Sequence, residues 1–283
     1  MAHKNFETTY ALLSEPRTKI MGILNVTPDS FAGDGIFNQS QETISTALKV
    51  AERFISEGAD IIDIGGESTR PGATPVDVDH ELQRILPVIK AIRDRFNIPL
   101  SIDTTKALVA KEALLAGGTI INDVSGLLMD VEMSKVVADS GVPAIIMHNP
   151  LARIDAIVDT SNDITQNVIK DLKALVAQLI SRGVKQHQII LDPGVGAGSG
   201  FGKTPLQDLN LIKNLNLFKE LPYPILLGAS RKSFIGQLTG AAVDQRLPAS
   251  LAVATIATWH KADIIRVHDV APTKQIIQLL EAI

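Results

Sequence analysis

Short apolar runs alternate with amphipathic segments along nearly the whole chain. The apolar runs are hydrophobic almost without interruption, as expected of parallel strands that are covered by helices. Eight runs of this kind predict strands at residues 19–26, 60–66, 99–103, 119–124, 144–148, 188–192, 224–228 and 263–268.

The segments between these runs have the period of an α-helix. Two apolar faces show it: Ile44, Leu48, Ala51 and Ile55 form one, and Ile164, Val168, Leu172, Leu175 and Leu179 form the other. Glycines at positions 58, 117, 118, 141 and 183 stand between a helical segment and the next apolar run, where a helix C-cap is expected. The chain is therefore predicted to repeat a strand and a helix.

Eight such units in 283 residues average about 35 residues each, which suits a (β/α)8 TIM barrel of ~250 residues. No linker or low-complexity segment divides the chain, so one domain is predicted over residues 1–283, with the barrel itself at about 18–283. The alternative is an open doubly wound sheet. That fold usually has fewer strands and a glycine-rich first turn, which this sequence lacks.

Composition narrows the functional classes. Hydrophobic residues make up 45% and aromatic residues 4%, so aliphatic side chains must fill the core. The net charge is −4 without a basic block, which argues against a nucleic-acid partner. The absence of cysteine excludes thiolate metal sites and disulfides and suits a reducing cytosol. No run has the length of a signal peptide core or a membrane span, so a soluble cytoplasmic protein is expected.

One glycine-rich stretch, LDPGVGAGSGFGKT at residues 191–204, resembles a phosphate-binding Walker loop. That motif requires glycine at the position of Ala197, and Gly196 and Gly198 each miss it by one residue. An ordinary strand-to-helix loop is the favoured interpretation, with Lys203 as a loop residue and a nucleotide hydrolase as the alternative.

Polar residues lie toward the carboxyl end of every predicted strand or just after it. They are Asn25, Asp63, Asp103, Asn122, His148, Asp192, Ser230 with Lys232, and Arg266 with His268. A single Asp or Asn at such a position often caps the next helix. Because the carboxyl ends of barrel strands form the active site, eight polar ends together predict a binding site at that end.

The side chains indicate what this site would bind. Arg266 and His268 suit a phosphate or diphosphate, and the amide oxygen of Asn25 suits Mg²⁺. The group of Asp103, Asn122, Asp192 and Lys232 suits a planar heterocycle with several N–H groups. Polar loops at TPDSFAGDGIF and ESTRPGATPV are predicted to cover the substrate. Hydrolytic schemes lack a Ser/His/Asp order or a spaced carboxylate pair.

Several stretches identify a family. The sequences GILNVTPDSF, ADIIDIGGESTRPGATPV, SIDTTK, INDVSG, LDPG, LLGASRKSFIG and RVHDV resemble dihydropteroate synthases, from about residue 19 to residue 270. The resemblance implies a TIM barrel that forms a homodimer, uses Mg²⁺ and is a target of sulfonamides. It also implies condensation of 6-hydroxymethyl-7,8-dihydropterin diphosphate with p-aminobenzoate, which yields 7,8-dihydropteroate and diphosphate.

The resemblance assigns roles to individual positions. Pterin binding falls to Asp103, Asn122, Asp192, Lys232 and Met147, with Asp63 beside them. Diphosphate binding falls to Asn25, Arg266, His268 and Thr69, and Asn25 is also the metal ligand. Contact with p-aminobenzoate falls to Thr69, Arg70, Pro71, Ser230 and Lys232. Catalytic roles fall to Asp103, Arg70 and Lys232.

Some positions depart from the family pattern. The first loop reads SFAGDG where SFSDGG is usual, so Ala32 and Gly33 precede a displaced acid, Asp34. The loop after the sixth strand has about three extra residues, near Ala197–Ser199. Two alternatives stay open: a pterin-binding methyltransferase barrel, and a pterin-binding homologue without catalytic activity.

Overall fold

The computed structural model describes residues 2–27, 41–68, 74–152, 161, 163–196 and 202–283, and it contains a strand in each predicted region. The strands are β1 (Lys19–Asn25), β2 (Ile61–Gly65), β3 (Leu100–Asp103), β4 (Ile120–Asp123), β5 (Ala144–Met147), β6 (Ile189–Asp192), β7 (Leu226–Leu227) and β8 (Ile264–Val267). Only β7 is much shorter than predicted.

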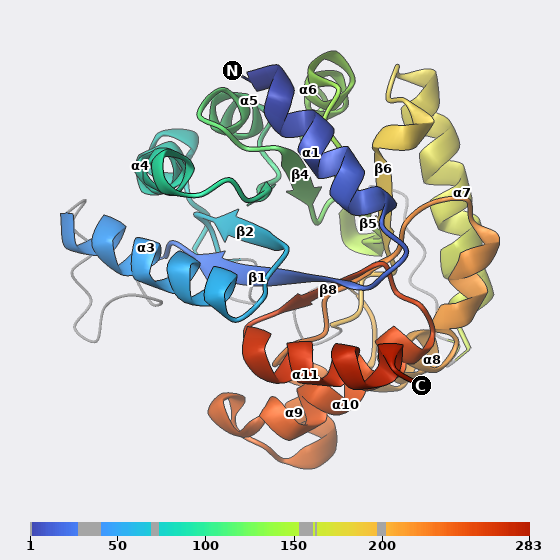
Figure 1. Cartoon of the computed structure of the whole chain (residues 1–283). Helices are drawn as coiled ribbons and strands as arrows, with labels where there is room; N and C mark the ends of the chain where they lie inside the picture. The colour runs from blue at the N-terminus through green and yellow to red at the C-terminus, as the bar shows by residue number, and fades with distance from the viewer. Residues whose placement is uncertain (1, 28–40, 69–73, 153–160, 162, 197–201) are drawn as a thin grey trace.

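All neighbouring strands are parallel, in the order β6-β5-β4-β3-β2-β1-β8-β7. A parallel bridge between Leu191 and Ile225 joins the two ends of this sheet, and Leu191 N donates to Pro224 O at 2.9 Å. The sheet therefore closes into the predicted (β/α)8 barrel (Figure 1), and the open doubly wound alternative is wrong.

Helices surround the barrel (Figure 1). They are α1 (Ala2–Ser14), α3 (Gln41–Ser56), α4 (Val78–Arg95), α5 (Ala107–Leu115), α6 (Met133–Ser140), α7 (Thr165–Ser181), α8 (Pro205–Lys213), α9 (Ser233–Thr239), α10 (Leu247–Trp259) and α11 (Val270–Glu281). Short 3₁₀ turns lie at Pro150–Ala152, Gln186–Gln188, Leu215–Glu220 and Val243–Gln245. The predicted apolar faces of α3 and α7 pack on the strands, with Leu48, Ala51, Val168 and Leu172 buried.

The inside of the barrel has a layer of apolar side chains. Seven strands contribute to it, through Met21, Ile61, Ile120, Ile145, Ile190, Leu226 and Ile264. On β3, the buried Ser101 stands two residues before Asp103. Successive side chains of a strand point to opposite faces, so the residue two positions after each layer member also points inward. This layer therefore fixes which strand residues line the space above it.

Helix α1 lies across the amino-terminal end of the barrel (Figure 1), where Leu12 and Leu13 pack against the interior layer. Lys19 is buried below the layer and donates its ammonium to the carbonyls of Leu13 and Glu15 at the end of α1. Burial lowers the pKa of Lys19. The open end of the barrel is therefore the carboxyl end of the strands.

None of the helices in the described part of the chain combines the length and apolar character required to cross a bilayer.

Replacing one member of the interior layer should destabilise the whole barrel. Ile61 is fully buried, so Ile61→Ala should lower the free energy of unfolding by about 2–5 kcal/mol. Urea denaturation followed by circular dichroism measures this change. The control Leu115→Ala, at a leucine that is 75% exposed, should change it by less than about 0.5 kcal/mol. Equal effects of the two substitutions would contradict the layer.

Candidate active site

Strand alternation brings the predicted site residues together at the carboxyl end of the barrel. Two positions after a member of the apolar layer come Asp63, Asn122, Met147, Asp192 and Arg266. Asp103 occupies the equivalent position on β3, after Ser101. Asn25 on β1 and His268, just after β8, each come four positions after a layer member and so lie on the same side of the strand. A ring of polar groups therefore lies directly above an apolar floor.

Arg266 is the centre of this ring. Its Nε donates to Asp63 Oδ2 at 2.6 Å and its Nη2 donates to Asp103 Oδ2 at 2.6 Å. Asp63 is completely buried and also accepts from Asn122 Nδ2 at 3.1 Å. Burial opposes the charged form of Arg266, but the two carboxylates outweigh it and raise the pKa of Arg266. Asp63 therefore holds Arg266 and Asn122 in place, and its direct contact with a pterin stays a prediction.

The surroundings of Asp103 shift the pKa of its carboxyl group toward neutral pH. Burial raises the pKa of Asp103 to about 7, with the charge of Arg266 acting against it and that of Asp63 adding to it. A carboxylate in this state can accept N–H groups from a ring and can stabilise a cation nearby. Asp103 is therefore poised to change its charge near neutral pH.

A second carboxylate lies across the mouth, on β6. Asp192 accepts from Gly194 N through Oδ1 at 2.7 Å. Burial raises the pKa of Asp192, against the Gly194 hydrogen bond and the charge of Lys232. Burial and the charge of Arg266 lower the pKa of Lys232, while Asp192 acts to raise it. With Asn122 and Met147, these groups form the predicted surface for a planar heterocycle.

Hydrogen bonds and an ion pair connect the loops after β7 and β8. Ser230 Oγ lies 3.1 Å from His268 Nδ1 and accepts from His268 N at 3.2 Å. The next residue along each loop forms an ion pair, because Arg231 donates to both carboxylate oxygens of Asp269 at 2.9 and 2.6 Å. Arg231 has a left-handed backbone, with φ of 56°. The ion pair helps to hold this backbone conformation, and with it the turn between Ser230 and Lys232.

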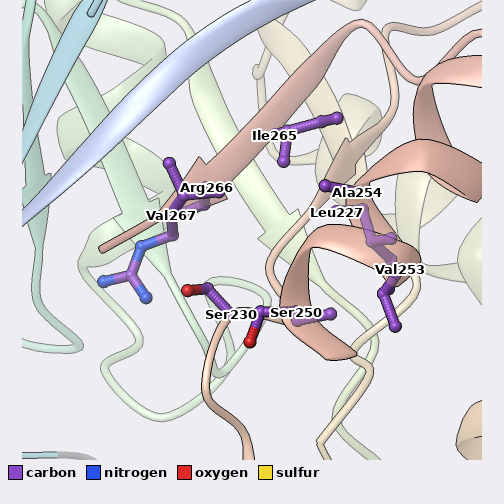
Figure 2. Close-up of a pocket in the computed structure, with 9 residues that line it drawn as sticks. Leu227, Ser230, Ser250, Val253, Ala254, Ile265, Arg266 and Val267 are labelled. Atoms are coloured by element: carbon purple, nitrogen blue, oxygen red, sulfur yellow. The ribbon is translucent and has the colours of Figure 1, made fainter. Parts of the chain in front are cut away.

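Figure 2 shows the other side of these loops. The Arg266 side chain points away from Leu227, Val253 and Ile265, which line a cavity of only about 10 Å³ between the strands and α10. That volume is about the size needed for one water. The cavity is therefore part of the packing behind the site, and it is too small to hold a substrate.

The sequence predicted that His148, at the end of the fifth strand, lies at the barrel mouth, but the structure places its side chain elsewhere. It follows the inward-facing Met147 and therefore points outward, where His148 Nε2 lies 3.3 Å from Asp171 on α7. Burial lowers the pKa of His148. The sequence places a polar group after each strand, but the alternation of side chains removes this one from the site.

The lysine of the Walker-like stretch has a structural task. Lys203 Nζ donates to the carbonyls of His148 and Gly194, each at 3.0 Å. Burial lowers the pKa of Lys203 to about 8, against the charges of Asp208 and Asp192. The backbone is so close here that a Cβ on Gly194 would lie 2.2 Å from His148 O. Lys203 therefore joins the ends of β5 and β6.

Asn25 is the residue predicted to hold Mg²⁺. It is half-buried at the mouth, and a Cβ on Gly65 would lie 3.8 Å from its Oδ1 and 3.4 Å from Asp103 Cβ. Glycine thus leaves space beside an amide oxygen. Mg²⁺ in proteins often takes few protein ligands together with substrate phosphates and water. No cluster of three or more His, Asp or Glu side chains able to bind a metal occurs among the described residues.

Some predictions concern residues outside the described ranges. These are the p-aminobenzoate contacts Thr69, Arg70 and Pro71, the altered first-loop positions Ala32, Gly33 and Asp34, and the extra residues near Ala197–Ser199.

Ser233, the first residue of α9, was not among the predicted site residues. Its hydroxyl is buried and has no hydrogen-bond partner among the described residues. It directly follows Lys232 in the sequence SRKS.

Taken together, the barrel and its mouth define a class of protein: a (β/α)8 barrel whose open end carries buried carboxylates and cations suited to an anionic substrate with a flat, nitrogen-rich ring. The sequence pattern of the family described as "Pterin binding enzyme" matches residues 21–268. The dihydropteroate synthase of Clostridium beijerinckii is 44% identical over 270 residues, which cover 94% of each chain.

Solved structures of dihydropteroate synthases are also similar to this chain. A structure of the Clostridium difficile dihydropteroate synthase in the presence of pteroic acid has a TM-score of 0.84 and 44% identity, covering 94% of this chain and 96% of that one. The Xanthomonas albilineans enzyme with 4-aminobenzoic acid has a TM-score of 0.85 and 38% identity, covering 95% and 93%. The chain therefore belongs to the dihydropteroate synthases, a family of pterin-binding enzymes.

The ionisation of Asp103 can be checked directly. Carbon-13 NMR of the aspartate carboxyl groups should show Asp103 titrating at about pH 7. Asp63→Asn removes a neighbouring negative charge that disfavours ionisation, so it should lower this pKa. The control Asp94→Asn, at an exposed carboxyl on α4, should leave it unchanged. A value for Asp103 near 4 in the unmodified protein would contradict the electrostatic description.

Proposed function

We propose that the chain condenses 6-hydroxymethyl-7,8-dihydropterin diphosphate with p-aminobenzoate to form 7,8-dihydropteroate and diphosphate. The observation that carries the proposal is the ring of Asp103, Asn122, Asp192 and Arg266 above the apolar floor. Relatives that share this fold and sequence have been solved with pteroic acid and with 4-aminobenzoic acid. The two ligands correspond to the product's skeleton and to one substrate.

The pterin would lie against the strand residues. Asp192 and Asp103 would accept N–H groups of the ring, Asn122 would pair with its amide edge, and Met147 would pack against its face. The positive charge of Lys232 acts on Asp192, and its ammonium is proposed to donate to a ring carbonyl or nitrogen. Asp63 is proposed to lie beside the ring, and it also fixes Asn122 and Arg266 through hydrogen bonds.

The diphosphate would lie at Asn25, Arg266 and His268, on the neighbouring strands β1 and β8. Mg²⁺, when bound through Asn25, would neutralise part of the charge that develops on diphosphate. His268 can donate to a phosphate oxygen through Nε2, since its Nδ1 faces Ser230. These contacts would be strongest as the leaving group gains charge, which lowers the barrier to its departure.

Bond exchange takes place at the pterin methylene carbon. The bond from this carbon to the diphosphate oxygen breaks first, and the pair of electrons leaves with diphosphate. The amino nitrogen of p-aminobenzoate then bonds to the same carbon and loses a proton. The ionised carboxylate of Asp103 would stabilise the cationic ring between these events. Thr69, Arg70, Pro71 and Ser230 are proposed to orient p-aminobenzoate and to help keep water from the cation.

Two further features belong to this proposal. We expect a homodimer, and we expect the protein in the cytoplasm, whose reducing conditions suit a chain without cysteine. Size-exclusion chromatography with light scattering and cell fractionation test them.

The purified protein should form dihydropteroate only when both substrates and Mg²⁺ are present. Mass spectrometry of the product, with one component omitted at a time, measures this requirement. Failure to form product, together with no binding of p-aminobenzoate after diphosphate is supplied, would contradict the proposal. Pterin binding without turnover would instead identify a non-catalytic homologue. Tight binding of methyltetrahydrofolate without diphosphate would favour a methyltransferase.

Two substitutions should distinguish residues that bind the pterin ring from residues that bind the diphosphate. Asp192→Asn should weaken binding of both 6-hydroxymethylpterin and its diphosphate, because the ring loses a charged acceptor. His268→Gln should weaken binding of the diphosphate alone. Each loss should be about 1.5–3 kcal/mol, the range for hydrogen bonds to charged groups. Calorimetric titration with the two ligands measures both, and identical profiles for the two variants would refute the assigned positions.

A further inference from the structure

The ammonium group of Lys203 lies at the ends of β5 and β6, and the proposed reaction does not use it. Its Nζ donates to His148 O and to Gly194 O, each at 3.0 Å. The side chain is buried, and lysine is almost never buried unless its charge is paired. A buried cation at the edge of the mouth therefore requires an explanation beyond the joining of two strands.

Both carbonyl groups belong to residues that also hold Asp192. The backbone N–H of His148 donates to Asp192 O at 2.8 Å. The backbone N–H of Gly194 donates to the carboxylate of Asp192, at Oδ1, over 2.7 Å. Lys203 and Asp192 are therefore connected twice, through Gly194 to the carboxylate and through His148 to the backbone.

The turn that follows Asp192 is tightly packed. Gly194 has a left-handed backbone, with φ of 72°. A Cβ at this position would lie 2.2 Å from His148 O and 3.0 Å from Lys203 Nζ, so only glycine can be accommodated. The chain after β6 thus passes directly over the end of β5, and one ammonium with three N–H donors serves the carbonyls of both. The direction of the Gly194 N–H, and with it the Asp192 carboxylate, is set by this arrangement.

Asp208 supplies a negative charge that favours the ionised form of Lys203. It is fully buried in the first turn of α8. Burial lowers the pKa of Lys203 to about 8, and the charges of Asp208 and Asp192 act against this change. Burial raises the pKa of Asp192, whereas the Gly194 hydrogen bond and nearby cations, Lys203 among them, act to lower it. Lys203 therefore influences the charge of Asp192 as well as its orientation.

We propose that Lys203 is a positioning residue for the pterin: it holds the Asp192 carboxylate in the orientation and charge state that accept N–H groups of the ring. The inference rests on the pterin-binding part of the proposed function. Both hydrogen bonds of Lys203 end on backbone oxygens, so its effect on a ligand passes through Asp192. A lysine that only joined two strands would change stability without selecting one ligand.

The first variant is Lys203→Met, which removes the ammonium and keeps much of the side-chain length. It should weaken binding of 6-hydroxymethylpterin at least about fivefold, since small misplacements of positioning groups can cost up to about a hundredfold. Calorimetric titration measures this Kd. The KM for p-aminobenzoate at saturating pterin diphosphate should stay within about twofold. Lys203→Gln keeps a neutral donor and should show the same selective loss, which covers the case that Lys203→Met does not fold.

A double-mutant cycle tests whether Lys203 acts through Asp192. Substitutions that affect one shared contact are not additive. Adding Lys203→Met to Asp192→Asn should therefore weaken binding of 6-hydroxymethylpterin by less than about twofold beyond Asp192→Asn alone. Fully additive losses would overturn the inference.

Lys19 is a matched control at the opposite end of the barrel. It is also buried, and its ammonium also donates to two backbone carbonyls, those of Leu13 and Glu15. Lys19→Met should lower the melting temperature and leave the Kd for 6-hydroxymethylpterin unchanged. Equal weakening of pterin binding by Lys19→Met and Lys203→Met would assign the effect to lost stability and overturn the inference.

The binding measurements do not depend on turnover. An unchanged Kd for 6-hydroxymethylpterin in Lys203→Met would overturn the inference, and so would an equal rise in the KM for p-aminobenzoate. An unmodified protein that binds the pterin but forms no dihydropteroate would overturn the proposed function alone, and a selective loss in Lys203→Met would still support the inference. An unmodified protein that does not bind the pterin would overturn both.

Discussion

The architecture of the site depends on one guanidinium inside the barrel. Arg266 contacts Asp63 on β2 and Asp103 on β3 from its place on β8. Three strands are thereby connected across the mouth, and Asp63 extends the connection to Asn122 on β4. Without Arg266, two buried carboxylates would face each other unpaired, and at least one would be expected to take up a proton.

Arg266 can contact the two carboxylates and still have N–H groups for the proposed diphosphate. A guanidinium presents five N–H donors in a plane. Arg266 uses Nε and Nη2 for the carboxylates, and the geometry of the group leaves further donors for a diphosphate. Its proposed role toward the leaving group and its contact with Asp103 are therefore compatible.

Periodicity was sufficient to predict the barrel, since each strand region is an apolar run and the segments that form α3 and α7 have clear apolar faces. The ring residues were also predictable, because Asp63, Asn122, Asp192 and Arg266 each follow an inward-facing residue by two positions. The same rule could have excluded His148, which follows the inward-facing Met147 by one position. The prediction took the polar residue at the end of each run without asking whether its side chain points into or out of the barrel. His148 was therefore assigned to the mouth.

Other features could not be predicted from local sequence. Arg266 and Asp63 are separated by 203 residues, and their contact depends on barrel closure and on the rotamers of both side chains. Lys203 looked like a loop residue because its partners, the carbonyls of His148 and Gly194, carry no sequence signal. Lys106 is similar, since only the fold brings Glu67 and Glu81 to one ammonium group.

Helix α1 and the apolar layer close the amino-terminal end of the barrel, so within the described part of the chain a ligand reaches the ring from the carboxyl end of the strands. The residues proposed for the pterin ring are mainly on the strands, and Ser230, proposed to contact p-aminobenzoate, lies above them after the end of β7. A molecule at the upper position would block the path to the lower one. Substrates bound in this way must add in order, with the pterin first, and the joined product must leave before the next pterin can enter.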